Sequence, residues 1–372
     1  MYDAIVVGAR CAGSPTAMLL ARAGHNVLLL DRDEFPSDIM STHFIHLAGK
    51  VRLHRWGLLD RVMATDVPAI PKNNLHFGEI VMSPPPLPMP DGLDNQTLCP
   101  RRHILDKILV DAAVEAGAEL RQGVSVRELI RDGDVVVGVR GQTKDKAPVE
   151  ERAKIVIGAD GMHSIVAREV QAEEYDTKPT LTFGYYAYWA GVSDPDMHIY
   201  FFEDSHGVLS FPTHDGLSCV GVGGAIEGFH EFRKDIEGNY MSIVNRVPGL
   251  AAEMRAGGRK ERFVGTAAQP NFFRVPYGPG WALVGDAGYH RDFLTGLGIT
   301  DAFRDAELLS QALHEGFSGT RQMEEALGDY QAKRDDLAKP LYDFTTKMAS
   351  GFMPEVNEFM TFGAAMARMI NS

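Results

Sequence analysis

The alternation of apolar and polar positions predicts strands and helices in turn over roughly the first 165 residues. Short apolar runs that end at a glycine, such as Ala4–Val7, are typical of strands buried on both faces. The apolar spacing over Arg102–Ala116 is typical of a helix, and Val124–Ile157 indicates several strands with a turn at Gly141–Pro148. This order predicts an α/β fold with a Rossmann-like sheet.

The pattern changes between about Thr180 and Phe273, where bulky aromatic residues recur at alternate positions. Runs such as TFGYYAYWAGV and HIYFFED predict a half-buried, mainly antiparallel sheet. A helix is expected in the same part of the chain, at about His230–Val244. Earlier in the chain, the prolines of Ser83–Gly92 predict a loop that borders a second domain.

Helices are expected again in the last part of the chain. One helix begins at about Gly298, and the helical pattern from Ser310 onward is interrupted at Pro340. The final residues form an apolar stripe with helical spacing that includes Val356, Phe359, Phe362, Met366 and Met369. A membrane-skimming face or a dimer contact would use such a stripe, but internal packing is favoured, because the polar face lacks the lysines of a membrane-surface helix.

A glycine turn follows the first apolar run. Gly8 permits a tight turn after the strand, and Gly13 lets the next helix, which begins near Ser14, pack closely on the sheet. The helix N-terminus would face a pyrophosphate, and Asp31 ends the second strand, where it is placed to accept hydrogen bonds from ribose hydroxyls. Arg10 occupies the usual middle-glycine position, so its guanidinium either lies over the pyrophosphate or is solvated.

The stretch Trp281–Asp305 contains a similar turn and a second group of glycines. Gly285 ends an apolar run so that Asp286 points at a sugar or ribityl hydroxyl. Gly296 and Gly298 bring backbone N–H groups to a helix N-terminus, which favours the electron-rich edge of a reduced flavin. A flavin is therefore the ligand that these residues predict.

A third strand and turn lie between these two, where the sequence GADG contains Asp160 and Gly161. With all three motifs in order, the chain resembles the group A FAD-dependent monooxygenases (the 4-hydroxybenzoate hydroxylase-like family) and their relatives, the geranylgeranyl reductases and flavin-dependent halogenases. The resemblance covers roughly the whole chain. Arg102 matches the arginine of the family's RxxLxxxL helix start, which Leu105 and Leu109 complete.

The resemblance implies a bound FAD and a set of cofactor-binding residues. These are Gly8, Ala9, Arg10, Gly13, Ser14, Asp31, Arg32, Arg102, Asp160, Gly285, Asp286, Gly296, Leu297 and Gly298. The chain departs from the family at Phe293, where most members have a proline beside the flavin ring, at Tyr289, which replaces a histidine, and at Thr300, which replaces an asparagine.

The same resemblance implies a discontinuous FAD-binding domain with an inserted substrate domain. We expect the FAD-binding domain over residues 1–80, 101–178 and 274–320, and the substrate domain over residues 81–100 and 179–273. Residues 321–372 would form C-terminal helices. In the family, the aromatic sheet covers the isoalloxazine and the substrate lies between the two.

The resemblance favours a monooxygenase that uses NAD(P)H and dioxygen to hydroxylate or epoxidise an electron-rich aromatic or polyketide-like small molecule, through a C4a-hydroperoxyflavin. The alternative is a reductase that passes hydride to a carbon–carbon double bond, as geranylgeranyl reductases do; Phe293 keeps this alternative open. A halogenase is less favoured, because no WxWxIP stretch is present. A flavin-binding carrier or sensor without turnover is the remaining possibility.

Candidate catalytic residues are Tyr186, Tyr188, His43 and His290. On the strand Thr182–Ala190, alternation places the two tyrosines on one face and Phe183, Tyr185 and Trp189 on the other. We expect the Tyr186 and Tyr188 face to meet the flavin, because a phenolic hydroxyl in a dry pocket both positions a substrate oxygen and relays its proton. His43 and His290 are candidate proton relays, and His214, at a turn of the aromatic sheet, is a candidate substrate contact.

The composition limits the kinds of partner and cellular environment that we expect for this chain. A formal net charge of −13 disfavours nucleic acid and leaves a small organic molecule as the expected substrate. The three cysteines, Cys11, Cys99 and Cys219, are widely spaced, which fits a reducing cytoplasm better than a disulfide framework. No histidine spacing predicts a metal site, and neither a secretory signal nor a transmembrane run is expected. We therefore expect a soluble, cytoplasmic monomer or homodimer.

Overall fold

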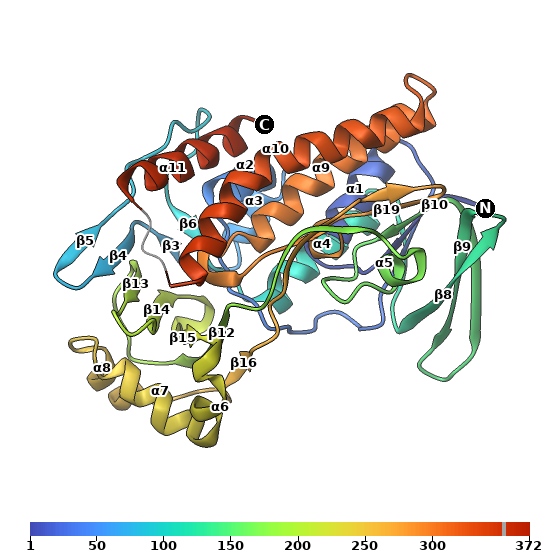
Figure 1. The fold of residues 1–372 in the computed structure, drawn as a ribbon. Coiled ribbons are helices and arrows are strands. Elements are labelled where there is room, and N and C mark those ends of the chain that lie inside the picture. Colours follow the sequence, from blue (N-terminus) through green and yellow to red (C-terminus); the bar gives the residue numbers. More distant parts are fainter. Residues whose placement is uncertain (352–354) are drawn as a thin grey trace.

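The computed structural model describes residues 1–351 and 355–372. Its first large sheet, here the parallel sheet, has parallel strands in the order β19, β10, β1, β2 and β7; Figure 1 labels β19 and β10. Their bounds are β19 (Trp281–Leu283), β10 (Pro148–Gly158), β1 (Tyr2–Val7), β2 (Val27–Leu30) and β7 (Glu119–Arg121). Antiparallel strands extend it: β18 (Tyr277–Gly278) pairs with β19, and β9 (Val135–Thr143) pairs with β10 and with β8 (Val124–Asp132).

The parallel strands are short apolar runs because both of their faces are covered. On one face the apolar cluster includes residues of α1 (Gly13–Arg22), α2 (Leu47–Arg55), α3 (Leu59–Met63), α4 (Arg102–Glu115) and α9 (Gly298–Phe317). On the other face, α5 (Ile165–Val170) and the β8–β9 hairpin contribute the cluster. The Rossmann-like α/β prediction is confirmed.

The second large sheet, here the aromatic sheet, has the strand order β16, β12, β15, β14, β13, β4 and β5. It is antiparallel except where β13 and β4 pair in parallel. The bounds are β16 (Val264–Thr266), β12 (Thr182–Trp189), β15 (Ser218–Ala225), β14 (Gly207–Pro212), β13 (Met197–Phe201), β4 (Asn73–Phe77) and β5 (Ile80–Met82). Residues from 73 onward thus pair with this sheet, ahead of the boundary expected at residue 80.

Two smaller sheets complete the strands. The first joins β11 (Glu174–Lys178), β17 (Asn271–Arg274) and β20 (Tyr289–His290), and the second joins β3 (Ala69–Ile70) and β6 (Thr97–Leu98). Short 3-10 turns lie at His214–Gly216, Ile226–Gly228, Arg233–Asp235, Gly285–Ala287 and Phe293–Thr295. Residues 83–96 form the loop that the prolines predicted, without a regular element.

The helix expected over residues 230–244 is divided. It consists of α6 (Phe229–Phe232), a 3-10 turn and α7 (Ile236–Val244), because Asp235 leaves the helical conformation and its carboxylate accepts the Gly238 N–H as an N-cap at 2.9 Å. A further helix, α8 (Leu250–Gly257), was not predicted. These helices cover the outer face of the aromatic sheet (Figure 1).

The interruption expected at Pro340 is wrong. The helix α10 (Met323–Ala349) continues through this proline, which removes one backbone donor but leaves Leu337 and Leu341 buried on either side. The last helix, α11 (Val356–Asn371), packs on α10 and α2. Internal packing is confirmed for Met366 and Met369 of the apolar stripe, whereas the side chain of Val356 lies outside what the structure describes.

In the described part of the chain, none of the helices has both the length and the apolar character that crossing a membrane requires.

Candidate functional site

The carboxyl ends of the parallel strands surround one cavity of about 3160 Å³. Ligands of doubly wound sheets bind at this edge. The three motifs, which are far apart in sequence, follow the neighbouring strands β1, β10 and β19 and therefore meet there. From this edge the cavity extends along the aromatic sheet to α10 and α11.

Most of the predicted cofactor residues line this cavity. They are Gly8, Arg10, Asp31, Arg32, Arg102, Asp160, Asp286, Gly296 and Gly298. The others are buried directly behind the lining: Ala9, Gly13, Ser14, Gly285 and Leu297.

The glycine turn after β1 has no room for a side chain at Gly8 or at Gly13. Gly8 has a φ of +103°, and a Cβ there would lie 2.5 Å from the carbonyl oxygen of Ala159. A Cβ on Gly13 would lie 1.7 Å from the carbonyl oxygen of Gly8. The turn therefore brings bare backbone close to the cavity at the N-terminus of α1, as a pyrophosphate site requires.

Asp31 helps to hold this turn in place. One of its carboxylate oxygens accepts the Ala9 N–H at 2.6 Å, and the other accepts the Asp33 N–H at 2.8 Å. Each oxygen has a second lone pair, so the carboxylate retains acceptor capacity at the cavity, where a ribose was expected.

Arg10 lines the cavity and is held by two carboxylates, so its guanidinium is not solvated as one of the two alternatives required. Its guanidinium donates to Asp106 at 2.7 Å and to Asp33 at 2.9 Å, and its side chain is 15 % exposed. Asp106 is fully buried and also accepts two hydrogen bonds from Arg102, each at 3.0 Å. The Asp106 carboxylate thus positions both Arg10 and Arg102. Asp106 was not identified from the sequence, although its i,i+4 spacing from Arg102 on a helix indicates that the two side chains can pair.

The other two motif acids have different environments. Asp160 accepts the Ile165 N–H at 2.7 Å and so fixes the turn that leads into α5. Asp286 is exposed to the cavity, and its enclosure by protein raises the pKa of its carboxyl group. Both acids line the cavity, and Asp286 is the more exposed of the two.

The N-terminus of α9 opens into the cavity. Gly296 has a φ of +63°, which turns the chain into the helix, and Leu297 is the N-cap residue. Gly298 is exposed, and a Cβ at this position would meet no atom within 4 Å. The first N–H groups of a 20-residue helix therefore face open space in the cavity, which suits the negative end of a reduced flavin.

These residues fit FAD, because they offer a close-approach glycine turn for the pyrophosphate and a helix N-terminus for the flavin ring. A family model described as an FAD binding domain matches residues 1–345. The chain belongs to this family. It is an FAD-dependent oxidoreductase, and FAD is its cofactor.

Other family members align with nearly the whole chain. The sequence is 27% identical over 377 residues to Digeranylgeranylglycerophospholipid reductase 1 of Methanopyrus kandleri, covering 96% of this chain and 92% of that protein. The fold resembles the myxobacterial chondrochloren halogenase CndH (TM-score 0.85, 20% identity, covering 100% of this chain and 90% of that one). It also resembles PqsL of Pseudomonas aeruginosa in complex with 2-aminobenzoylacetate (TM-score 0.78, 21% identity, covering 100% of each chain).

Three of the predicted catalytic residues lie together. The ring centroids of His43, Tyr186 and Tyr188 are 5.7 to 5.8 Å apart. Tyr188 and His43 share a hydrogen bond between Oη and Nε2, and the Ser41 N–H donates to the Tyr186 hydroxyl at 3.3 Å. Tyr186 lines the cavity, whereas Tyr188 and His43 are buried behind it. As alternation predicted, these two tyrosines share one face of β12, and the opposite face packs on α6 and α7.

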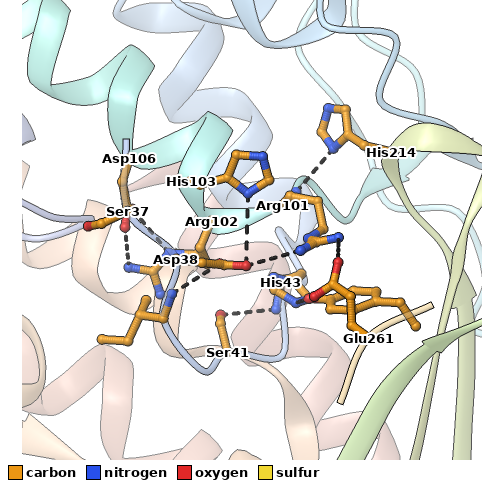
Figure 2. Close-up of polar contacts among 12 residues, drawn as sticks. Ser37, Asp38, Ser41, His43, Arg101, Arg102, His103, Asp106, His214 and Glu261 are labelled. Atoms are coloured by element: carbon orange, nitrogen blue, oxygen red, sulfur yellow. Dashed lines mark hydrogen bonds and ion pairs between the residues drawn. The ribbon is translucent and has the colours of Figure 1, made fainter. Parts of the chain in front are cut away.

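A charged cluster that the sequence did not reveal supports this group. Figure 2 shows Arg101 between Asp38 and Glu261, at 3.1 and 2.8 Å respectively. The same guanidinium lies 3.8 Å from the centre of the Tyr188 ring. No sequence motif links these residues, because they come from a loop, the start of α4 and the approach to β16.

The two remaining histidines lie elsewhere. His290 lines the cavity, and its Nδ1 is hydrogen-bonded to the Pro270 carbonyl oxygen. His214 is not a cavity residue; its Nδ1 accepts the Arg101 N–H at 3.1 Å (Figure 2), and its Nε2 pairs with the Thr65 hydroxyl at 2.8 Å. The suggested substrate contact of His214 is therefore corrected to a structural role.

We expect His43 to make the protein less stable in acid. Burial, followed by the charge on Arg102, lowers the pKa of His43 from 6.5 to about 3. In the unfolded chain His43 therefore binds a proton near pH 6.5, whereas in the folded chain it stays neutral until about pH 3. The free energy of unfolding consequently falls as the pH drops through this window. The loss from this one group should be on the order of 3 kcal/mol at pH 4.

The measurement is urea unfolding of FAD-saturated protein at pH 7.5 and pH 4.5, for the unmodified chain and for His43→Asn. Asparagine tolerates the left-handed backbone of this position, whose φ is 61°, and retains a polar group for Tyr188. The unmodified chain should lose more stability between the two pH values than the variant does. Equal losses would show that His43 does not titrate in this way.

Proposed function

We propose that this FAD-dependent oxidoreductase reduces a carbon–carbon double bond in an elongated, largely apolar small molecule. The observation that supports this proposal is the cavity. Its volume of about 3160 Å³ is several times the roughly 300–1,000 Å³ of an ordinary small-molecule site, so it has room for FAD and for a long substrate. The digeranylgeranylglycerophospholipid reductases that align with nearly the whole chain support this reaction over the oxygen insertion expected from the sequence.

Bound FAD supplies the two-electron chemistry, with NAD(P)H as the expected reductant. One alkene carbon receives hydride and the other receives a proton, which the protein must provide. Tyr186 is the proposed donor. Tyr186 lines the cavity, and burial raises the pKa of its hydroxyl to about 12, so the phenol is protonated throughout the neutral range. The Ser41 N–H at 3.3 Å would stabilise the phenolate that remains.

Tyr188 and His43 are proposed to position this donor. Because the pKa of His43 is lowered to about 3, its ring is neutral and accepts or donates a hydrogen bond without charge. The backbone N–H of His43 donates to the Ser41 hydroxyl at 3.0 Å, which ties the two residues of this loop together. His290, on the cavity wall, is retained as a candidate proton relay.

Monooxygenation is the second candidate, with NAD(P)H and dioxygen as co-substrates. The observation that favours it is Tyr186, which is the one of the two tyrosines on this face of β12 that lines the cavity. Its hydroxyl would orient the oxygen of a phenolic or polyketide-like substrate next to the flavin. Tyr186 would therefore serve either reaction. The two reactions are distinguished by whether product formation requires oxygen.

The test is conversion under strict anaerobiosis. FAD-loaded protein is reduced with NADPH or NADH, or with dithionite, and mixed with a polyprenyl alcohol or with a phenol; mass spectrometry then identifies the product. We expect the polyprenyl alcohol to gain two hydrogen atoms in the absence of dioxygen. Addition of one oxygen atom, only when oxygen is admitted, would replace the reductase proposal with the monooxygenase one. Flavin that neither oxidises NAD(P)H nor converts any substrate would identify a carrier.

A further inference from the structure

We propose that the hydrocarbon chain of the substrate binds in an arm of the cavity whose far wall is the C-terminal helix α11. The identification of the ligand rests on the proposed function, but the arm itself is a feature of the structure. The arm is the part of the cavity lined by these residues of β4, β5, α10 and α11: Phe77, Met82, Phe344, Met348, Phe359 and Phe362. These six side chains are apolar and favour an apolar occupant, while Asn73 and His76 of β4 add polar groups to the cavity wall.

Aromatic rings form a continuous row along this arm. Phe201 of β13 stacks on Phe77 at 4.8 Å, and Phe77 contacts Phe359 of α11 at 6.1 Å. Phe359 meets Phe344 of α10 at 5.3 Å, and Phe344 meets Phe362 at 4.5 Å. The row thus leads from the aromatic sheet to the C-terminal helices, which Figure 1 shows beside the β4–β5 hairpin.

The arm begins next to the flavin loop. Thr295, in the loop that leads to the N-terminus of α9, shares a hydrogen bond of 2.8 Å with Thr345 of α10. The neighbouring residue Phe344 belongs to the aromatic row. The hydrocarbon chain of a substrate whose double bond reacts at the flavin would therefore pass directly into the arm. For this reason a substrate hydrocarbon fits the arm better than a second copy of this protein does.

Gly363 provides a precise way to close the arm. It lies on α11, lines the cavity, and a Cβ built on it would meet no atom of the described residues within 4 Å. A larger side chain at this position would enter the open space of the arm without colliding with the protein. Because leucine and phenylalanine both favour a helix more than glycine does, the substitution should preserve α11.

The test measures binding rather than turnover. Oxidised, FAD-loaded protein is titrated with geraniol, farnesol and geranylgeraniol, and flavin fluorescence or calorimetry reports the affinity. Binding should tighten with chain length in the unmodified protein. Gly363→Phe, and independently Gly363→Leu, should weaken geranylgeraniol binding roughly tenfold or more while geraniol binding and FAD content stay unchanged.

Thr361→Phe is the matched control, because Thr361 lies on the same helix, is exposed and does not line the cavity. This variant should bind all three alcohols as the unmodified chain does. Equal weakening by Thr361→Phe and Gly363→Phe would place the contact on the outer surface of α11, as in self-association, and overturn the proposal. Affinity that is independent of chain length would also overturn it. Failure to reduce any double bond, with these binding results intact, would refute only the reductase function.

Discussion

Gly13→Ala is expected to leave the chain almost without FAD. A Cβ at this position would lie 1.7 Å from the Gly8 carbonyl oxygen and 3.1 Å from the Cβ of Ala159. Both neighbours belong to the turns after β1 and β10 that surround the expected FAD site, here the cofactor cradle. The nearer neighbour is a backbone atom, so it cannot move aside by a change of side-chain rotamer. The turn after β1 must therefore move away from the pyrophosphate position. We expect FAD affinity to fall at least a hundredfold, which corresponds to about 3 kcal/mol.

Purified protein should show the difference directly in its flavin absorption relative to protein concentration, with circular dichroism as a check that the variant folds. Gly363→Ala is the control, because the added Cβ meets no atom of the described residues within 4 Å. That protein should retain the full flavin complement. A yellow Gly13→Ala protein with an unchanged flavin ratio would show that the cradle is not at the turn after β1.

The cofactor cradle was largely predictable because each of its motifs is local. Gly8, Asp160 and Asp286 each follow a short apolar strand, so a reader of the sequence can place them at strand ends without knowing the topology. Parallel pairing of β1, β10 and β19 then brings the three ends to one edge. The strand order determines where the three segments lie relative to one another, but the glycines and acids expected to bind the cofactor can be recognised within each segment alone.

The contacts between segments were not predictable in the same way. The ion pair of Arg10 with Asp106 could not be foreseen, because the two residues are 96 positions apart in the chain. The position of β4 depends on a parallel pairing with β13, more than a hundred residues later, and nothing in the short run of β4 indicates that partner. The prediction at Pro340 failed for a related reason: the burial of many α10 side chains, Leu337 and Leu341 among them, together outweighs the roughly 3 kcal/mol local cost of a proline within a helix.

The proposed donor should have the largest effect on turnover of any cavity residue. Tyr186→Phe removes one hydroxyl and leaves the ring, so FAD content and the packing against Tyr188 should be unchanged. Loss of a general acid typically lowers the rate by about 10²–10⁴-fold. We therefore expect kcat to fall at least a hundredfold with little change in KM, since the hydroxyl acts on the reacting carbon and the apolar cavity still binds the substrate.

Tyr185→Phe is the matched control for this prediction. It makes the same change on the same strand; Tyr185 also lines the cavity, but its ring packs against Phe232 at 5.3 Å on the opposite face of the aromatic sheet. Anaerobic single-turnover reoxidation of the reduced flavin by a polyprenyl substrate measures the chemical step for both variants. A slow Tyr186→Phe and a normal Tyr185→Phe would assign the proton to Tyr186. If KM rises while kcat is retained, the hydroxyl only binds the substrate, and another group, with His290 as the next candidate on the cavity wall, must supply the proton.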